Sequence, residues 1–356
     1  MYRKNLIFTA ACISIFLFRA GLITLGSIIP ELQKKFDLDQ VAAGVLFSLL
    51  PLGILTGSLI FGPIADRYGY RLVLAIACLC MFAGFEGIAY ADTMLVLKIC
   101  VYLFGTGGGA INGGTSAVIA DISKSKGSAL SLLGVFFGLG ALFMPFILAS
   151  LQNTLSFGTV LATVGFITLL PALFFLVLDF PVPKQTNNQP LFSSIALLKD
   201  HVLLLIAFFL FCQSSFEGII NNWTTSYLIQ HLSVPPDKAL YALTLYLAGM
   251  TVSRLLIGTV FSSLNSFKLL FVSFILILAG CILLETGAAY KMAVSGLVLL
   301  GAGLGGGFPL LLGLVANRYT TLSGTAFSFV LVIALVGNML VSYEWVYLLI
   351  PTESII

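Results

Sequence analysis

Residues 62–71 read Gly62-Pro63-Ile64-Ala65-Asp66-Arg67-Tyr68-Gly69-Tyr70-Arg71 and join two long apolar runs. This short stretch holds an acid, two arginines and two glycines. The sequence around it is repeated, with fewer charged residues, 196 residues later, where Gly62 has its counterpart in Gly258. We therefore expect a duplicated membrane protein in which this charged turn joins two spans of the first half.

The composition of the chain is that of a protein embedded in lipid. Hydrophobic residues make up 59% and charged residues 9%, and the mean hydropathy is +1.10, whereas soluble domains carry about 25% charged residues. The six cysteines all lie in apolar runs, and none forms a CxxC pair. No nucleophile–base set, metal cluster or cofactor loop is visible. We expect a monomer in the lipid bilayer, with no enzymatic activity, no cofactor, no metal and no nucleic-acid partner.

Apolar runs of roughly 20 residues, enough to cross the hydrocarbon, recur eleven times. We place the spans near 6–30, 41–62, 72–90, 94–120, 127–150, 155–178, 200–230, 239–262, 267–286, 292–316 and 323–350. The one extended polar stretch separates the sixth span from the seventh. The fold class predicted is an all-α polytopic membrane protein with a six-helix bundle in 1–180, a linker in 181–199 and a second bundle in 200–356.

Lysine and arginine set the orientation of such a protein, because they are enriched in cytoplasmic loops. With the N-terminus inside, ten of them fall on the inner side: Arg3, Lys4, Arg67, Arg71, Lys124, Lys126, Lys184, Lys199, Lys268 and Arg318. Five fall outside, at Lys34, Lys35, Lys98, Lys238 and Lys291. We therefore predict a multi-pass protein of the plasma membrane, in bacteria the inner membrane, with a cytoplasmic N-terminus and linker.

The internal repeat is a series of glycines that match in order at an offset of 196 residues. The matched pairs are Gly53 with Gly249, Gly62 with Gly258, Gly105 with Gly301, Gly107 with Gly303 and Gly109 with Gly305. With one extra residue, 127–131 then matches 324–328. Two halves of six spans would enter the membrane from the same side and hold a solute near the midplane. The counterpart of the sixth span falls at 351–374, so we expect the last helix to be missing or reduced to a stub.

The stretch that opens this section resembles the loop between the second and third helices of the major facilitator superfamily. The matching residues are Gly62, Asp66, Arg67, Gly69 and Arg71, and the resemblance implies a two-bundle transporter fold. Asp66 at a helix end is suited to pair with an arginine or with a neighbouring helix terminus, and the glycines permit close approach and a tight turn. We predict a gating role for these five residues. The alternative is a solvated charged turn that has no gating role and only follows the enrichment of basic residues in cytoplasmic loops.

Within the superfamily, the seventh span resembles the fucose/glucose/galactose symporter-like branch in its stretch 211–228. Residues 301–309, 324–328 and 337–338 are also similar to that branch. Gln213, Glu217 and Asn221 share one helix face, and a carboxylate in hydrocarbon needs a wet cavity, a partner or a proton. Glu217 is therefore both a substrate-binding and a proton-coupling candidate. Asn222 and Trp223 are further substrate-binding candidates, Trp223 by stacking on a sugar ring. The alternative is polar packing between helices with no ligand.

Four more polar residues lie inside spans. Arg19 occupies the first span, where the branch offers an acid; it favours an anionic substrate or a pair with Glu217, and snorkelling is the alternative. Asn112 and Asn338 either line the cavity or hydrogen-bond between helices. Arg254 is a gating candidate that could instead snorkel.

Together these features predict a secondary active transporter for a small polar solute, most simply a sugar or sugar-like metabolite, with a proton as a possible coupling ion. It would work by rocking two bundles about a central site. A proton-coupled exporter of drugs or metabolites with the same fold is the first alternative. A non-functional truncated copy is the second.

Overall fold

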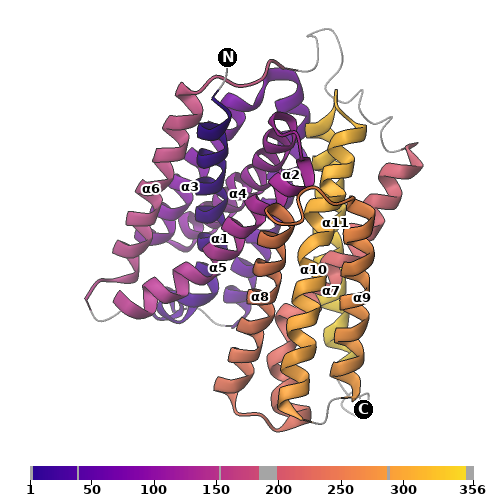
Figure 1. The fold of residues 1–356 in the computed structure, drawn as a ribbon. Coiled ribbons are helices and arrows are strands. Elements are labelled where there is room, and N and C mark those ends of the chain that lie inside the picture. The colour runs from indigo at the N-terminus through magenta and orange to yellow at the C-terminus, as the bar shows by residue number, and fades with distance from the viewer. Residues whose placement is uncertain (1–2, 38–39, 152–153, 184–198, 287–288, 350–356) are drawn as a thin grey trace. The chain divides into compact units, whose positions relative to one another are not determined.

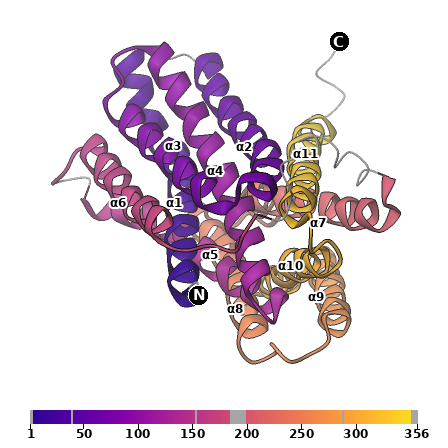
Figure 2. The same cartoon turned by 90° about the horizontal axis from the view of Figure 1, so that it is seen from above.

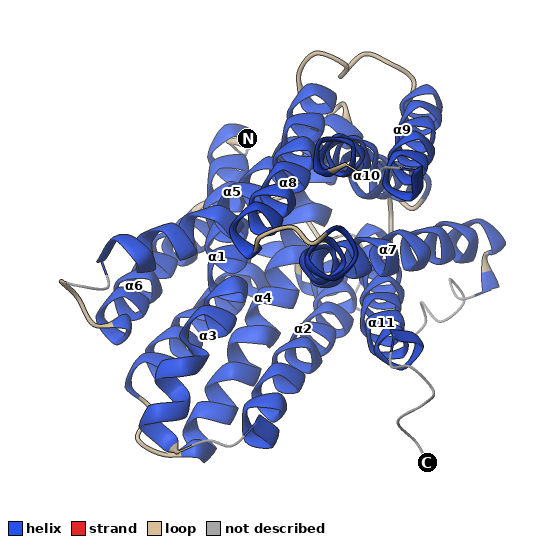
Figure 3. Ribbon diagram, turned by 90° about the horizontal axis from the view of Figure 1, so that it is seen from below, coloured by secondary structure: helices blue, strands red, loops and turns tan. Residues whose placement is uncertain are grey.

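The structure is a computed structural model that describes residues 3–37, 40–151, 154–183, 199–286 and 289–349. In these ranges the chain forms α-helices and no β-strand, as Figure 3 shows. The helices, labelled in Figure 1, are α1 (Lys4–Phe36), α2 (Gln40–Tyr68), α3 (Tyr70–Tyr90), α4 (Met94–Ile122), α5 (Lys126–Leu151), α6 (Phe157–Val177), α7 (His201–Leu232), α8 (Pro236–Gly258), α9 (Ser266–Thr286), α10 (Tyr290–Arg318) and α11 (Ser323–Leu349). All eleven are long and apolar enough to cross a membrane. The predicted fold class is confirmed.

The chain folds into two compact units, and two of its helices begin in one unit and end in the other. The first unit holds Met1–Lys124, Phe136–Leu197 and Ala316–Phe329, and the second holds Ser125–Val135, Leu198–Val315 and Val330–Ile356. Helix α5 therefore begins in the second unit and ends in the first, while α11 begins in the first and ends in the second. The division into bundles at a linker 181–199 stays a prediction, because most of that linker, 184–198, lies outside the described residues.

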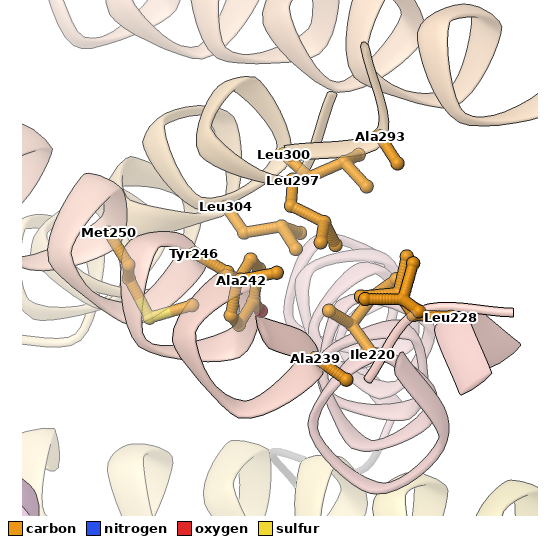
Figure 4. Packing of buried hydrophobic residues seen from close by; sticks show 11 residues of the cluster. Ile220, Leu228, Ala239, Ala242, Tyr246, Met250, Ala293, Leu297, Leu300 and Leu304 are labelled. Carbon is orange, nitrogen blue, oxygen red and sulfur yellow. The ribbon is translucent and has the colours of Figure 1, made fainter. Parts of the chain in front are cut away.

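In the first unit, α4 packs against α1, α2 and α3, and α6 packs against α1 and α3, an arrangement that can be followed in Figure 2. In the second unit, a buried hydrophobic cluster is built by α7, α8, the connection between them and α10. Its residues are Ile220, Leu228, Val234, Ala239, Ala242, Tyr246, Met250, Ala293, Leu297, Leu300 and Leu304 (Figure 4). Because these helices are apolar on most sides, close backbone packing has to hold them together where lipid gives no hydrophobic drive.

The repeat seen in the sequence is also a repeat of packing. At several glycines a Cβ would meet a backbone carbonyl of the neighbouring helix, so only glycine permits the observed approach. Four such contacts have a counterpart 196 residues later: Gly53–Tyr102 and Gly249–Val298, Gly105–Leu50 and Gly301–Tyr246, Gly107–Ala77 and Gly303–Ser273, Gly109–Ile54 and Gly305–Met250. Both partners of these four contacts are therefore duplicated.

The same offset holds where α5 and α11 begin. Gly62 of α2 faces the carbonyl of Gly324 and the side chain of Ser328, and Gly258 of α8 faces Ser128 and Leu132 in the same way. Ser128 lies 196 residues before Gly324, so packing needs no extra residue between the two halves. The predicted register, which paired Gly127 with Gly324, is wrong by one residue here, because residue similarity matched two glycines that occupy different places in the contact.

Helix α2 runs through the stretch 62–68 and ends at Tyr68, six residues later than predicted. Pro63 lies inside this helix, where proline removes the donor for the carbonyl four residues earlier. That carbonyl, of Leu59, accepts a hydrogen bond from the Ser328 hydroxyl at 3.1 Å. The turn itself is only Gly69, whose φ of 85° lies in the left-handed region that favours glycine.

Candidate functional site

The first group of polar side chains surrounds Asp66 in the last turn of α2. Only 1% of Asp66 is exposed. Its Oδ1 accepts from the backbone N–H of Gly324 at 3.0 Å, and its Oδ2 accepts from the N–H and the hydroxyl of Thr325, each at 2.7 Å. The first N–H groups of a helix have no partner within the helix, and the positive end of its dipole lies there. The carboxylate therefore caps the N-terminus of α11.

A second acid, Asp121 in the last turn of α4, holds the same helix end from another side. It accepts from the hydroxyl of Ser323, the first residue of α11, at 3.0 Å, and from the hydroxyl of Tyr70, the first residue of α3, at 2.7 Å. We call Asp66, Tyr70, Asp121, Ser323 and Thr325 the Asp66 cluster. It ties α2, α3 and α4 to the beginning of α11.

The other predicted gating residues of this stretch lie around the cluster. Gly62 is buried against α11, as described above, and Gly69 makes the turn. The Arg71 guanidinium donates to the carbonyl of Leu176 near the end of α6, and the Arg67 guanidinium lies 5.3 Å from the ring centre of Tyr68. Gly62 and Asp66 thus contact α11, whereas Arg71 contacts α6.

The second group of polar side chains surrounds Glu217 in the middle of α7. The Gln213 amide nitrogen donates to Glu217 Oε1 at 2.9 Å and to the carbonyl of Leu304 on α10 at 3.0 Å. A Cβ at Gly307 of α10 would collide with this amide, so glycine makes room for it. Gln213 is 7% exposed, and its amide oxygen has no hydrogen-bond partner. A buried acceptor of this kind is available to a hydroxyl donor.

Helix α8 adds Tyr246 and Arg254 to this group. Tyr246 is fully buried, and its hydroxyl has no hydrogen-bond partner. Both side chains lie within electrostatic range of the Glu217 carboxylate. Arg254 is 8% exposed and donates to backbone carbonyls of α5 and α10, so the snorkelling alternative is wrong: the guanidinium turns into the protein. We call Gln213, Glu217, Tyr246 and Arg254 the Glu217 cluster.

The remaining predicted residues fall in different places. The Arg19 guanidinium of α1 lies 4.6 Å from the ring centre of Phe137. Arg19 belongs to the first unit and Glu217 to the second, so their pairing stays a prediction. Asn338 donates to the carbonyl of Ser214 at 2.9 Å, the helix-to-helix bond that was one of its two alternatives. Asn112 and Asn221 are half-buried, and the side chains of Asn222 and Trp223 lie outside the described residues.

Comparison with known proteins places the fold in a family. The model of the Major Facilitator Superfamily matches residues 11–342. The chain belongs to this superfamily. The predicted resemblance is confirmed, and with it the general class of multi-pass membrane transporter.

Some of the similar proteins have a solute in their names and others do not. The inner membrane transport protein YdiN of Escherichia coli (strain K12) is 28% identical over 248 residues, which cover 67% of this chain and 58% of YdiN. The glucose/mannose transporter GlcP of Bacillus subtilis (strain 168) is 24% identical over 316 residues, covering 85% of this chain and 78% of GlcP. The crystal structure of the E. coli fucose:proton symporter FucP (N162A) superposes with a TM-score of 0.80 at 16% identity, covering 96% of this chain and 91% of FucP. That likeness describes the fold.

Several residues of the two clusters escaped the sequence analysis. Tyr70, Asp121, Ser323 and Thr325 join the Asp66 cluster, and Tyr246 joins the Glu217 cluster. A signal existed for Asp121, which the repeat matches with Asn317 at the end of the corresponding helix. Tyr246 had none, because one tyrosine in an apolar span looks like an ordinary core residue.

Proposed function

We propose that this member of the major facilitator superfamily is a secondary active transporter that moves a small polar solute, a sugar or sugar-like metabolite, across the plasma membrane by alternating access. Its place is the bacterial inner membrane, with the N-terminus in the cytoplasm. The proposal rests above all on one observation: Gln213 presents a buried amide oxygen without a partner beside the carboxylate of Glu217.

The chemistry of the Glu217 cluster supports a ligand with hydroxyl groups. An amide oxygen accepts a hydrogen bond from a hydroxyl, and a carboxylate accepts further hydrogen bonds. An apolar ligand would leave both groups without these hydrogen bonds. Asn112, Asn221, Asn222 and Asn338 would add amides, and Trp223 an aromatic plane, around the same solute. The name of the relative GlcP, a glucose/mannose transporter, agrees with this ligand class. Glu217 is also our candidate for the group that takes up a coupling proton.

The Asp66 cluster supports the alternating part of the proposal. It fastens the first turn of α11, a helix whose later part belongs to the other compact unit. Because the fastening consists of side-chain hydrogen bonds to a helix end, it can break and form again without refolding a helix. We assign Gly62, Asp66, Arg67, Gly69 and Arg71 to this gate, with Tyr70 and Asp121 as further members.

A second candidate solute is an anionic sugar derivative. Arg19 favours it, because a half-buried guanidinium in a membrane span, stacked on Phe137, offers a cation that a carboxylate would bind strongly.

Uptake into proteoliposomes that contain the purified full chain tests both candidates. The panel is labelled D-glucose, D-mannose, L-fucose, D-xylose and D-gluconate, each with and without an inward proton gradient. We expect saturable uptake of at least one neutral sugar, lost in Gln213→Leu and kept in the control Thr244→Val, whose side chain is exposed on α8. Gluconate uptake that depends on Arg19 would favour the anionic solute. Uptake of none of the five by well-folded protein would contradict the proposal.

A further inference from the structure

Arg254 is the one arginine of the spans of the second unit whose side chain is buried among the described residues, at 8% exposure. A cation in this position needs a partner, because an uncompensated buried charge is strongly destabilising. Its Nε donates to the carbonyl of Gly305 on α10 at 3.3 Å, and a terminal nitrogen donates to the carbonyl of Gly134 on α5 at 3.4 Å. Carbonyl oxygens orient the guanidinium, but they carry no full charge to balance it.

The carbonyl of Gly305 is available for a reason that lies in the sequence of α10. Pro309 stands four residues later in the same helix and has no N–H, so the helix cannot satisfy that oxygen. Arg254 supplies the missing donor. At Gly134 a Cβ would lie 3.0 Å from Arg254 Cδ, so a glycine leaves space for the arginine stem on the α5 side.

The amide of Gln213 links the carboxylate of Glu217 to the same turn of α10. Gln213 holds Glu217 and donates to the carbonyl of Leu304, which directly precedes the carbonyl that Arg254 binds. Two consecutive carbonyls of one helix thus receive one side chain from α7 and one from α8. Tyr246 and Arg254 of α8 both lie within electrostatic range of Glu217, and α10 contributes the backbone carbonyl of Leu304 to Gln213.

We propose that Arg254 is the counter-charge of Glu217 and that it transmits the charge state of this carboxylate to α5 through Gly134. Arg254 is then a positioning residue. It contacts α5 and α10 and acts on the solute through Glu217. The role of Glu217 in transport rests on the proposed function, whereas the charge balance does not.

The guanidinium carries five N–H donors in a rigid fork, so it can serve the two carbonyls and Glu217 together. When Glu217 takes a proton from water, or when a solute engages it, the attraction toward α7 is lost. The guanidinium then keeps only its carbonyl partners and holds α5 more firmly. Because α5 runs from the second unit into the first, an event at Glu217 would alter a helix that both units share.

A double-mutant cycle on the purified full chain tests the charge balance without any solute. Thermal unfolding is measured for Arg254→Gln, Glu217→Gln and the double variant. We expect each single change to lower the unfolding temperature by several degrees and the double variant to regain part of the loss seen in Arg254→Gln. Losses that simply add would overturn the pairing. If Arg254→Gln does not fold, a double variant that does fold supports the pairing. If the double variant also fails to fold although Glu217→Gln folds, the pairing is wrong.

The same cycle with Arg19→Gln in place of Arg254→Gln identifies the partner. Recovery only with Arg254 supports our assignment, and recovery only with Arg19 transfers the role of counter-charge to α1 and overturns it. Arg254→Lys keeps the charge and loses the fork, so it should retain most of the unfolding temperature if charge balance is the main role of Arg254.

Transmission to α5 needs a readout that a merely structural residue would not move. Ser131, buried one turn before Gly134, is replaced by cysteine in a chain without its six native cysteines, and alkylation by N-ethylmaleimide is timed. We expect Glu217→Gln to slow the reaction several-fold and Arg254→Gln to accelerate it several-fold, with Thr244→Cys as the unaffected control. Equal rates in all backgrounds would overturn the link to α5. Because no solute is used, failure here leaves the uptake experiment to decide the proposed function separately.

Discussion

At the scale of single residues, Asp66 connects two helices through one carboxylate. Its carboxylate is buried and accepts three hydrogen bonds, two of them from backbone N–H groups at the beginning of α11. Hydrogen bonds to a charged group contribute about 1.5–3 kcal/mol each, and the helix dipole adds up to ~2 kcal/mol in a partly buried geometry. A change from carboxylate to amide keeps the shape of the side chain and removes part of this stabilisation.

We therefore predict that Asp66→Asn slows transport several-fold and lowers the unfolding temperature by a few degrees. The asparagine oxygen can still accept one hydrogen bond, but its NH2 group faces donors of Thr325 and leaves them unsatisfied. Initial uptake rates in proteoliposomes and thermal unfolding in detergent measure the two effects. Asp92, exposed in the short connection between α3 and α4, offers the matched control Asp92→Asn, which should leave both unchanged. Wild-type transport by Asp66→Asn at normal expression would show that the carboxylate is no part of the gate.

At the scale of helices, the two copies of the repeat fasten a neighbouring helix with different strength. The first copy uses the buried carboxylate of Asp66. Its counterpart at the 196-residue offset is Ser262, whose carbonyl accepts from the hydroxyls of Ser125 and Ser128 at 3.4 Å each. These bonds are long, neutral and exposed, so they add little to stability. The glycine contact between the helices is retained, at Gly258 against Leu132, while the charge is not.

From this asymmetry we predict that the double change Ser125→Ala and Ser128→Ala has a small effect, of about 0.5 kcal/mol, because the two hydrogen bonds that it removes are long and neutral. Thermal unfolding and uptake rates are compared with those of Asp66→Asn under the same conditions. A loss as large as that of Asp66→Asn would mean that the two halves of the gate are equivalent after all.

At the scale of the whole molecule, we predict the direction in which the chain enters the membrane from its basic residues. Ten lysines and arginines fall on the side of the N-terminus and five on the other, and such an excess marks the cytoplasmic side. The Asp66 cluster would then close the cytoplasmic end of the transporter.

The orientation has a direct test at Thr186, in the connection between α6 and α7. We expect Thr186→Cys, in a chain without native cysteines, to react with a membrane-impermeant maleimide only after the cells are opened. Labelling of intact cells would place the connection outside and reverse the assignment of every loop. An engineered cysteine at Asp92, expected on the outer side, is the matched control and should react in intact cells.

Much of this architecture could be read from the sequence because its physical causes are local. Long apolar runs predict helices wherever lipid leaves no other way to satisfy the backbone, and the glycine repeat predicts duplicated packing because only glycine lets two backbones approach so closely. Glu217 and Gln213 could be placed on one face of α7 from their spacing alone, and their hydrogen bond agrees.

What the tertiary structure decided are the partners of each polar group, since these come from helices far apart in the chain. Asp66 binds the beginning of α11, some 258 residues away, and Arg254 binds a carbonyl that Pro309 has freed on α10. Composition and spacing predict that a buried charge needs a partner. They do not predict which one, because many helices have carbonyl groups and helix ends that could serve. Which of them is near enough depends on how the helices pack, and that is a property of the fold as a whole.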